Sequence, residues 1–319
     1  MRFEFYINYK QDIIMLPPYK VHDNGELIDL MVEPTNRCNL RCPTCFSHLD
    51  SREKRDMLFT DFRYIIDNSG ISIRNMSLYN YGEPLLNPDI WRMVKYARDS
   101  GVHHVKIDTN GMLLDGANIS SALSSGIDKI SISLDGACQE TYSKFRIGGS
   151  FAKVLSNIKE LVRRRDAASS DMEIELQFII MRHNQHELDA IRMLSEEIGV
   201  DILRFKRVLV RRKEWEYLLP DNKYSRYDGV TPQNTCNKPA RQLVINSNGT
   251  VIPCCYIVGD DVRKHALGNA FKESLSDILS GRKYMEFLEA CSSDKSALDC
   301  CRDCEEGNIN MDYDVMRLR

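Results

Sequence analysis

Three cysteines lie close together near the start of the chain, in the segment Cys38-Asn39-Leu40-Arg41-Cys42-Pro43-Thr44-Cys45, with C-x3-C-x2-C spacing. Three thiolates on one short loop can hold three of the four irons of a cubane iron–sulfur cluster. The fourth iron then lacks a protein ligand, and a small molecule can chelate it through an amine and a carboxylate. The spacing therefore predicts an iron–sulfur site with one open coordination position.

A structural zinc site is the alternative for this loop. Structural zinc needs four ligands, usually arranged as two close pairs. The one other Cys or His near the three cysteines is His48, three residues after Cys45. This spacing favours the cluster over zinc.

A second group of cysteines follows residue 235. Cys236 and Cys254 flank residues 243–252, whose apolar runs and central Asn-Gly pair predict a β-hairpin that returns the chain on itself. Cys301 and Cys304 then form a C-x2-C pair. Four thiolates can bind all four irons of a second cubane, or they can bind one structural zinc ion. Without further context, zinc is the simpler interpretation.

Four cysteines remain outside these two sets. Cys138 is expected to be a small buried hydrophobe, and Cys291 has no assigned role. Cys300 could replace Cys301 as a ligand, although C-x2-C is the commoner pair spacing. Cys255 adjoins a predicted ligand and could reach a substrate, so it is the candidate for a catalytic thiol.

Apolar, β-branched runs alternate with amphipathic segments after residue 27. Thr60 and Asn87 are expected to be N-cap residues, and Gly101, Gly126 and Gly199 are expected to end helices. Strands that alternate with helices predict an α/β fold with a parallel sheet and polar groups past the strand ends. The predicted strands are 28–33, 73–79, 103–108, 128–134, 173–181 and 201–207, and the predicted helices are 60–68, 88–100, 116–125, 151–165 and 186–198.

The composition limits the class of protein. The chain has 319 residues, of which 43% are hydrophobic and 28% charged, and its net charge of −3 argues against broad binding to nucleic acid. No apolar run has the length of a membrane span, and the first ten residues lack the core of a signal peptide. We therefore expect a cytoplasmic protein with no membrane partner. Eleven cysteines in such a chain indicate metal binding rather than disulfides.

The first cysteine loop, placed after a predicted strand, resembles the cluster-binding loop of the radical S-adenosylmethionine (SAM) superfamily. The later cysteines are similar to the auxiliary-cluster module of these enzymes, called Twitch in its short form and SPASM in its longer form. The module's C-x12-G-x4-C spacing runs from Cys236 through Gly249 to Cys254. The resemblance implies that SAM and two [4Fe–4S] clusters are the cofactors. The implied cluster ligands are Cys38, Cys42 and Cys45 in the first site and Cys236, Cys254, Cys301 and Cys304 in the second.

The resemblance also implies a domain organisation. It covers about residues 33–306, and it predicts an open, partial (β/α)6 barrel at residues 27–210. A connector at 211–235 would lead to a small iron–sulfur module of β-hairpin and helices at 236–319. Residues 1–26 are expected to be an extended N-terminal segment, too short for the peptide-recognition domain that some of these enzymes carry.

Two strand-end motifs are similar to SAM-binding elements of the superfamily. Tyr81-Gly82-Glu83 resembles a Gly-Gly-Glu element whose backbone and carboxylate bind the SAM ammonium group, with Tyr81 in place of the first glycine. Thr109-Asn110 resembles a Thr-Asn-Gly element near the SAM ribose. Each motif has an ordinary alternative as a turn between a strand and a helix.

Ser133 and Arg146 resemble the pair that holds the SAM carboxylate in this superfamily, since a guanidinium suits a carboxylate in a bidentate pair. The alternative is a surface arginine at a helix end. Thr44 departs from the family pattern, because the residue before the third cysteine is usually aromatic and borders the adenine. Phe46 could make that contact instead, or it could pack in the core.

The resemblance implies an oxidoreductase in which reductive cleavage of SAM yields a 5′-deoxyadenosyl radical that takes a hydrogen atom from a C–H bond. The layout is similar to that of the butirosin-type aminocyclitol dehydrogenases, in which a single auxiliary cluster accepts an electron. We therefore expect oxidation of a hydroxylated small molecule, such as a sugar or aminocyclitol, with flavodoxin or ferredoxin as electron donor.

Three alternatives stay open at this point. The first is a radical epimerase of a sugar or peptide residue, with Cys255 as hydrogen donor. The second is a maturase that modifies a peptide. The third is a non-catalytic iron–sulfur or zinc protein, which would leave the motifs at Glu83 and Arg146 unexplained.

Overall fold

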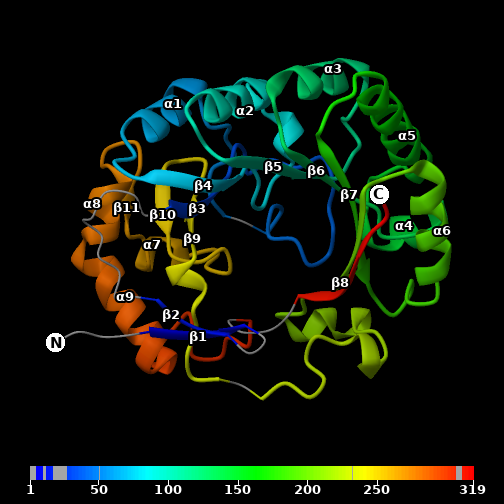
Figure 1. Ribbon diagram of the computed structural model, residues 1–319. Coiled ribbons are helices and arrows are strands. Elements are labelled where there is room, and N and C mark those ends of the chain that lie inside the picture. The colour runs from blue at the N-terminus through cyan, green and yellow to red at the C-terminus, as the bar shows by residue number, and fades with distance from the viewer. Residues whose placement is uncertain (1–4, 10–11, 17–26, 50, 232, 307–310) are drawn as a thin grey trace.

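The apolar runs between residues 27 and 207 pair side by side as parallel strands of one sheet (Figure 1). The computed structural model describes residues 5–9, 12–16, 27–49, 51–231, 233–306 and 311–319. All six predicted strands are confirmed, and the α/β class with them. They are β3 (Leu27–Val32), β4 (Ser72–Ser77), β5 (His104–Thr109), β6 (Lys129–Ser133), β7 (Glu173–Ile180) and β8 (Ile202–Arg207).

Helices cover the outer side of this curved sheet, as Figure 1 shows. Side chains alternate across each strand, so residues such as Val105 and Ile107 are buried in the core that faces the helices. The next residues along β5, Lys106 and Asp108, lie on the inner face and are only partly buried. The helices are α1 (Phe59–Asp67), α2 (Ile90–Asp99), α3 (Gly116–Ser125), α4 (Gln139–Phe145), α5 (Phe151–Ala167) and α6 (Leu188–Ile198).

The ends of these helices differ in part from the expectation. The two predicted N-caps are wrong, because α1 begins at Phe59, ahead of Thr60, and α2 begins three residues after Asn87. The Asn87 amide instead donates to the carbonyl groups of Pro34 (2.7 Å) and Met57 (3.0 Å). Helix α4 was not predicted, since its seven residues are too few to show a helical period.

The predicted helix-ending glycines are confirmed. Gly126 and Gly199 are left-handed C-caps with φ of 75° and 81°. Gly101, with φ of 89°, directly follows the C-cap of α2. Glycine adopts this conformation without the steric cost that a Cβ would add.

The C-terminal region extends the sheet at both of its edges. The predicted hairpin is confirmed as β9 (Gln242–Ile245) and β10 (Thr250–Ile252), and β9 also pairs in parallel with β3. At the other edge β12 (Asp312–Arg317) pairs antiparallel with β8. The full order is β11-β10-β9-β3-β4-β5-β6-β7-β8-β12, with β11 at Gly268–Asn269. The chain after residue 235 is therefore joined to the barrel by backbone hydrogen bonds.

The remaining elements are short, apart from one helix. Within residues 1–26, which were expected to be extended, β1 (Phe5–Tyr9) and β2 (Asp12–Leu16) form a separate antiparallel pair, and the other residues of that segment lie outside the described part. The helices after residue 235 are α7 (Asp261–Lys264), α8 (Leu275–Ser280) and α9 (Arg282–Ser293). The 3₁₀ turns are η1 (Pro84–Leu86), η2 (Lys213–Leu218), η3 (Asn222–Tyr224), η4 (Lys238–Ala240) and η5 (Lys295–Ala297).

No helix among the described residues is both long enough and apolar enough to pass through a bilayer.

The sheet is held by side chains packed between strands and helices. Phe178 of β7 and Phe205 of β8 are fully buried and meet edge to face, with ring centroids 5.7 Å apart. Burial of large aromatic side chains is a main source of the folding free energy of a core.

We predict that Phe178→Ala lowers the free energy of unfolding by about 3–5 kcal/mol, because it removes a fully buried ring and leaves a cavity. Denaturant unfolding of the metal-free protein followed by circular dichroism measures this loss. Met193→Ala is the matched control, since this side chain of α6 is 64% exposed. A loss below about 1 kcal/mol for Phe178→Ala contradicts the packing described here.

Candidate functional site

The predicted cluster loop lies after β3, at the carboxyl end of the parallel strands. Leu40 and Cys42 are buried in an apolar cluster, while Cys38 and Cys45 are half-buried. None of the three cysteines forms a disulfide. The backbone N–H groups of Leu40 and Ser47 donate to the sulfurs of Cys38 (3.4 Å) and Cys45 (3.5 Å). The loop is thus anchored by its apolar residues and presents its sulfurs to one region.

The two predicted cysteine sets can be compared with the spacing that a single zinc ion needs. Tetrahedral zinc, with Zn–S distances of about 2.3 Å, needs sulfurs about 3.8 Å apart. Among the described residues, one group of His, Cys, Asp or Glu ligand atoms has all of its atoms within 4.8 Å of one another. It consists of His265, Asp299 and Cys300. Neither predicted cysteine set is so tightly gathered. Both sets consist of free thiols, a donor set that fits an iron–sulfur cluster and also fits structural zinc.

Glu83 connects the motif that follows β4 with the motif at the end of β5. Its buried carboxylate accepts hydrogen bonds from Thr109 Oγ1 (2.6 Å), from Asn110 N (2.8 Å) and from Leu85 N (3.2 Å). Burial raises the pKa of Glu83, and the three donors oppose this shift. Asn110 in turn donates from its side chain to Asn39 Oδ1 (2.8 Å) in the cysteine loop. The structure thus brings three predicted SAM-site residues into one network beside the cysteines.

Gly82 lies against the start of the same loop. A Cβ at this position would be 1.9 Å from the carbonyl oxygen of Thr35, so no other residue fits without movement of the backbone. The next residue, Glu83, donates its backbone N–H to the carbonyl of Arg37 (2.8 Å). Close backbone approach therefore explains the glycine here.

Arg146 reaches the cysteine loop from the end of α4. Its Nη1 is 3.7 Å from the sulfur of Cys42, and its Nε donates to the fully buried carboxylate of Asp135. Burial raises the pKa of Cys42 to about 11, while the Arg146 charge lowers it. Ser133 lies at the end of β6, two residues before Asp135. Arg146 is therefore a buried cation beside the predicted cluster, and not a surface arginine.

Phe46 packs in the core, which is one of the two alternatives expected for it. It is 7% exposed and meets Tyr81 and Trp215 edge to face, with centroid distances of 5.5 and 5.9 Å. Trp215 belongs to the segment predicted as a connector. The connector therefore covers the cysteine loop from one side.

The second cysteine set surrounds a cavity. Cys300 lines it together with Lys238 and Lys295, and Lys295 donates to the carbonyl of Cys304. Contacts with Cys291 and Cys300 lower the pKa of Cys301, which favours the thiolate that binds metal. The four predicted ligands, Cys236, Cys254, Cys301 and Cys304, all line this cavity.

Two other thiols differ from each other in their surroundings. Cys255 is half-buried beside Cys254, and its charge raises the pKa of Tyr81, as the charge of Cys45 also does. Cys255 is therefore close to a residue that also neighbours the first cysteine set. The expectation for Cys138 is wrong, because this side chain is exposed at the start of α4. It is the N-cap residue of α4 and makes no side-chain cap hydrogen bond.

The sequence motifs contained several site residues whose roles were missed. Asp135 and Asn39 both stand inside segments that were singled out for other residues, yet they bind Arg146 and Asn110. Lys295 follows no motif, although a buried lysine near cysteines is a signal of a site that holds negative charge.

Comparisons with known proteins agree with this geometry. Residues 32–172 match the model of the radical SAM superfamily, and residues 236–305 match the SPASM model, described as an iron-sulfur cluster-binding domain. The chain carries a radical SAM domain followed by a SPASM domain. A radical SAM domain binds SAM and a [4Fe–4S] cluster, and a SPASM domain binds auxiliary iron–sulfur clusters, which confirms the predicted cofactors.

Relatives of this radical SAM protein differ in their activities. The chain is 30% identical to an AdoMet-dependent heme synthase of Methanosarcina barkeri, over 52% of this chain and 46% of that protein. It is 25% identical to a cofactor-modifying protein of tungsten-containing aldehyde ferredoxin oxidoreductase from Pyrococcus furiosus, over 85% and 88% of the two chains. The chain thus spans about half the length of the first relative and most of the second.

Solved structures share the fold. BtrN in complex with AdoMet and 2-DOIA has a TM-score of 0.56 at 18% identity, covering 92% of this chain and all of that one. Streptococcus suis SuiB bound to S-adenosylmethionine has a TM-score of 0.69 at 15% identity, covering 89% and 73%. At this level of identity the likeness confirms the partial-barrel fold and the C-terminal module.

We predict that Thr109→Val lowers the free energy of unfolding by about 1–3 kcal/mol, because the buried Glu83 carboxylate loses the hydroxyl donor at 2.6 Å. Urea unfolding of the metal-free protein at pH 7 measures the change. Thr60→Val, at an exposed position of α1, is the control for the loss of a hydroxyl. Equal stability of the two variants argues against the network around Glu83.

Proposed function

We propose that this protein is a radical SAM oxidoreductase that takes a hydrogen atom from a C–H bond of a hydroxylated small molecule of the sugar or aminocyclitol type. The supporting observation is that Cys42, Arg146 and the Glu83 network meet at the carboxyl ends of the parallel strands. In α/β folds this edge of the sheet is where ligands bind. The domains would be residues 27–210 and 236–319, joined by 211–235 and preceded by an extension at 1–26.

We assign the cluster ligands as the sequence predicts them. Each set consists of thiols without disulfides, and in both sets neighbouring backbone N–H groups or side-chain cations offset the negative charge of thiolates. The first cluster would be held by Cys38, Cys42 and Cys45, and the second by Cys236, Cys254, Cys301 and Cys304.

SAM would bind between the first cysteine set and the strand ends. Its ammonium group would meet the Gly82 backbone and the Glu83 carboxylate, whose four lone-pair positions are not all used by its three donors. Asn110 and Thr109 would border the ribose. Arg146 and Ser133 would hold the carboxylate, and Asp135 fixes the arginine by occupying its Nε.

The cofactors supply the radical chemistry: SAM with its cluster supplies the species that takes the hydrogen atom, and the auxiliary cluster supplies an acceptor for one electron. The protein residues then decide the outcome. Oxidation to a ketone would remove one hydrogen atom, one electron and the hydroxyl proton, which passes to solvent, and would need no hydrogen donor, whereas epimerisation would need a thiol on the opposite face of the substrate. Cys255 is the candidate for that thiol, and flavodoxin or ferredoxin is the proposed electron donor.

A peptide substrate is the second candidate. The observation that favours it is the fold shared with SuiB, since one solved structure of SuiB is bound to its precursor peptide SuiA. The inner face of the barrel favours the small molecule instead, because the charged and polar side chains on its strands suit a polar, hydroxylated ligand.

We predict that changing Cys38, Cys42 and Cys45 together to Ala abolishes SAM cleavage and leaves about four irons per chain, because one cubane remains. Iron analysis and formation of 5′-deoxyadenosine after anaerobic reconstitution measure both results. The wild type is expected to bind about eight irons. A wild type that cleaves no SAM, or that holds a single cluster, contradicts the proposed function.

We predict that Cys255→Ala still yields the ketone product and that no solvent deuterium enters the product of the wild type in deuterated buffer. The reason is that oxidation needs no hydrogen donor. Mass spectrometry of the product measures deuterium, and Cys138→Ala is the control, since this exposed thiol lies outside both cysteine sets. Should the wild type form a deuterated epimer that Cys255→Ala cannot form, epimerisation is the correct reaction.

A further inference from the structure

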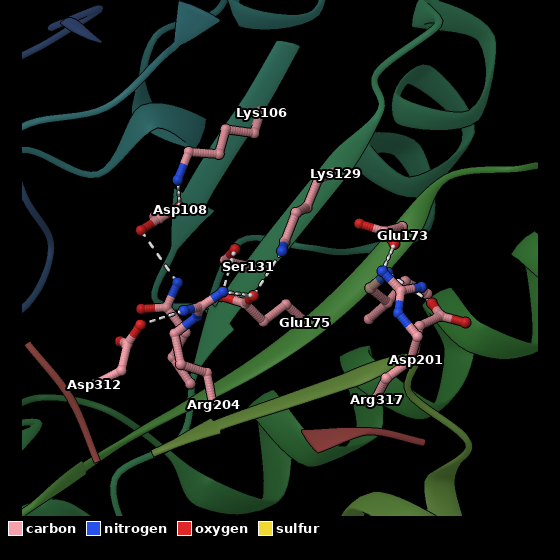
Figure 2. Close-up of polar contacts among 12 residues, drawn as sticks. Lys106, Asp108, Lys129, Ser131, Glu173, Glu175, Asp201, Arg204, Asp312 and Arg317 are labelled. Atoms are coloured by element: carbon pink, nitrogen blue, oxygen red, sulfur yellow. Dashed lines mark hydrogen bonds and ion pairs between the residues drawn. The ribbon is translucent and has the colours of Figure 1, made fainter. Parts of the chain in front are cut away.

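The inner face of the barrel carries a continuous group of charged side chains. Figure 2 shows part of this group turned toward one another from neighbouring strands, namely Lys106, Asp108, Lys129, Ser131, Glu175, Arg204 and Asp312. They occupy alternate positions on each strand, opposite to the apolar residues that face the helices. The group comprises Lys106 and Asp108 of β5, Lys129 and Ser131 of β6, Glu175 and Gln177 of β7, Arg204 and Lys206 of β8, and Asp312 of β12.

Most of these charges neutralise one another. Glu175, which is 2% exposed, lies 2.6 Å from Lys129 Nζ and 3.0 Å from Arg204 Nη2. These two cations lower the pKa of Glu175 to about 2, so it is ionised under all ordinary conditions. Arg204 also pairs with Asp312. This part of the group ties β6, β7, β8 and β12 together and needs no ligand.

Lys206 differs from its neighbours. Its ammonium donates to Gln177 Oε1 (2.8 Å), and no carboxylate oxygen of the described residues lies within 4.0 Å of it. Burial lowers the pKa of Lys206, and the more distant charges of Asp108, Glu175 and Asp312 only partly oppose this shift. The side chain is half-buried, so a ligand can reach it. A cation in such a place is costly unless an anion joins it.

Asp108 lacks a hydrogen-bond donor for one of its carboxylate oxygens. Its Oδ2 accepts from Gln177 Nε2 (3.2 Å), but its Oδ1 is buried and has no hydrogen-bond donor, with Lys106 Nζ at 3.9 Å. Gln177 thus spans the distance between Lys206 and Asp108. Together the three residues offer a ligand one strong donor and one strong acceptor.

These residues lie next to the proposed SAM site. Asp108 directly precedes Thr109, which binds Glu83, and Gln177 pairs in register with Ser133 of β6. A molecule held by Lys206 and Asp108 would therefore lie on the inner face of the sheet, below the strand ends where SAM is proposed to bind. This is the place for the substrate of a hydrogen-abstracting enzyme, because the two reactants must be close.

We propose that Lys206, Gln177 and Asp108 determine the substrate specificity, and that they select a hydroxylated small molecule that carries a carboxylate or phosphate group. The anionic group would pair with Lys206, and a hydroxyl would donate to the partly exposed carboxylate of Asp108. This inference rests on the proposed function and narrows it from sugars and aminocyclitols in general to acidic sugars or sugar phosphates.

The test is isothermal titration of the reconstituted holoenzyme with SAM and without reductant. The probes share one ring: D-glucuronate, D-glucose 6-phosphate, D-glucose and D-glucosamine. We expect at least one anionic probe to bind ten-fold or more tightly than the neutral and cationic probes. Lys206→Met should abolish this preference, whereas Lys206→Arg should retain it, since charge–charge pairing accounts for it. The two anionic probes distinguish carboxylate from phosphate.

Lys95→Met is the matched control, since Lys95 is an exposed lysine of α2 and should leave the preference unchanged. The inference is overturned by a wild type that binds neither anionic probe more tightly than glucose, by tighter binding of glucosamine, or by a preference that survives in Lys206→Met. If Lys206→Met does not fold, the wild-type panel and Lys206→Gln decide in the same way. Binding is measured without turnover, so failure of SAM cleavage by the wild type refutes the proposed function separately.

Discussion

The buried carboxylate of Glu83 is the interaction on which the arrangement of the site depends. A carboxylate that is 2% exposed is costly unless donors surround it, and this one has three of them. They come from the turn after β4 and from the end of β5, while the backbone of Glu83 binds the segment after β3 at Arg37. One residue, through its side chain and its backbone, therefore links the ends of three strands near the cysteine loop. Because Gly82 lies against Thr35 with no room for a Cβ, the turn after β4 has little freedom to move relative to the segment after β3.

The two faces of the sheet explain how one set of strands can serve both folding and chemistry. Residues one apart on a strand point to opposite sides, so β5 places Val105 and Ile107 in the core and Lys106 and Asp108 inside the barrel. The outer residues supply apolar burial, and the inner residues supply charge. On the inner face, ion pairs such as Lys129–Glu175 link neighbouring strands, because a partly buried charge must be matched nearby.

Sequence patterns gave the strands, most helices and the cysteine sets, because these depend on local order. Apolar runs identify the strands regardless of which strand each one pairs with. Close cysteine spacing identifies a loop that can hold metal. The pairing of β9 with β3 and of β12 with β8 could not be predicted, since it joins residues more than 100 positions apart. Helix α4 was too short to recognise.

The same limit applies to the site. Glu83, Thr109, Asn110, Arg146 and the cysteines were found from motifs, but the contacts that join them and some of their partners were not. Asp135 binds Arg146 across eleven residues, and Asn39 binds Asn110 across 71 residues. Lys206 stands in no motif at all, and its importance appears only when the strands are paired and its neighbours are found to be neutralised. Side chains that act through non-local contacts cannot be read from spacing alone.

The pairing of the C-terminal region with both edges of the sheet has a consequence for the two cysteine sets. Strand β9 is bonded to β3, which leads directly into the first cysteine loop, and β10 leads into Cys254. Backbone ladders therefore set the distance between the sets, instead of a linker that could vary. Tyr81 is near both Cys45 and Cys255, and its partial burial together with the charges of these two thiols raises its pKa. An aromatic side chain thus lies near both cysteine sets, at the position where the superfamily motif has a glycine.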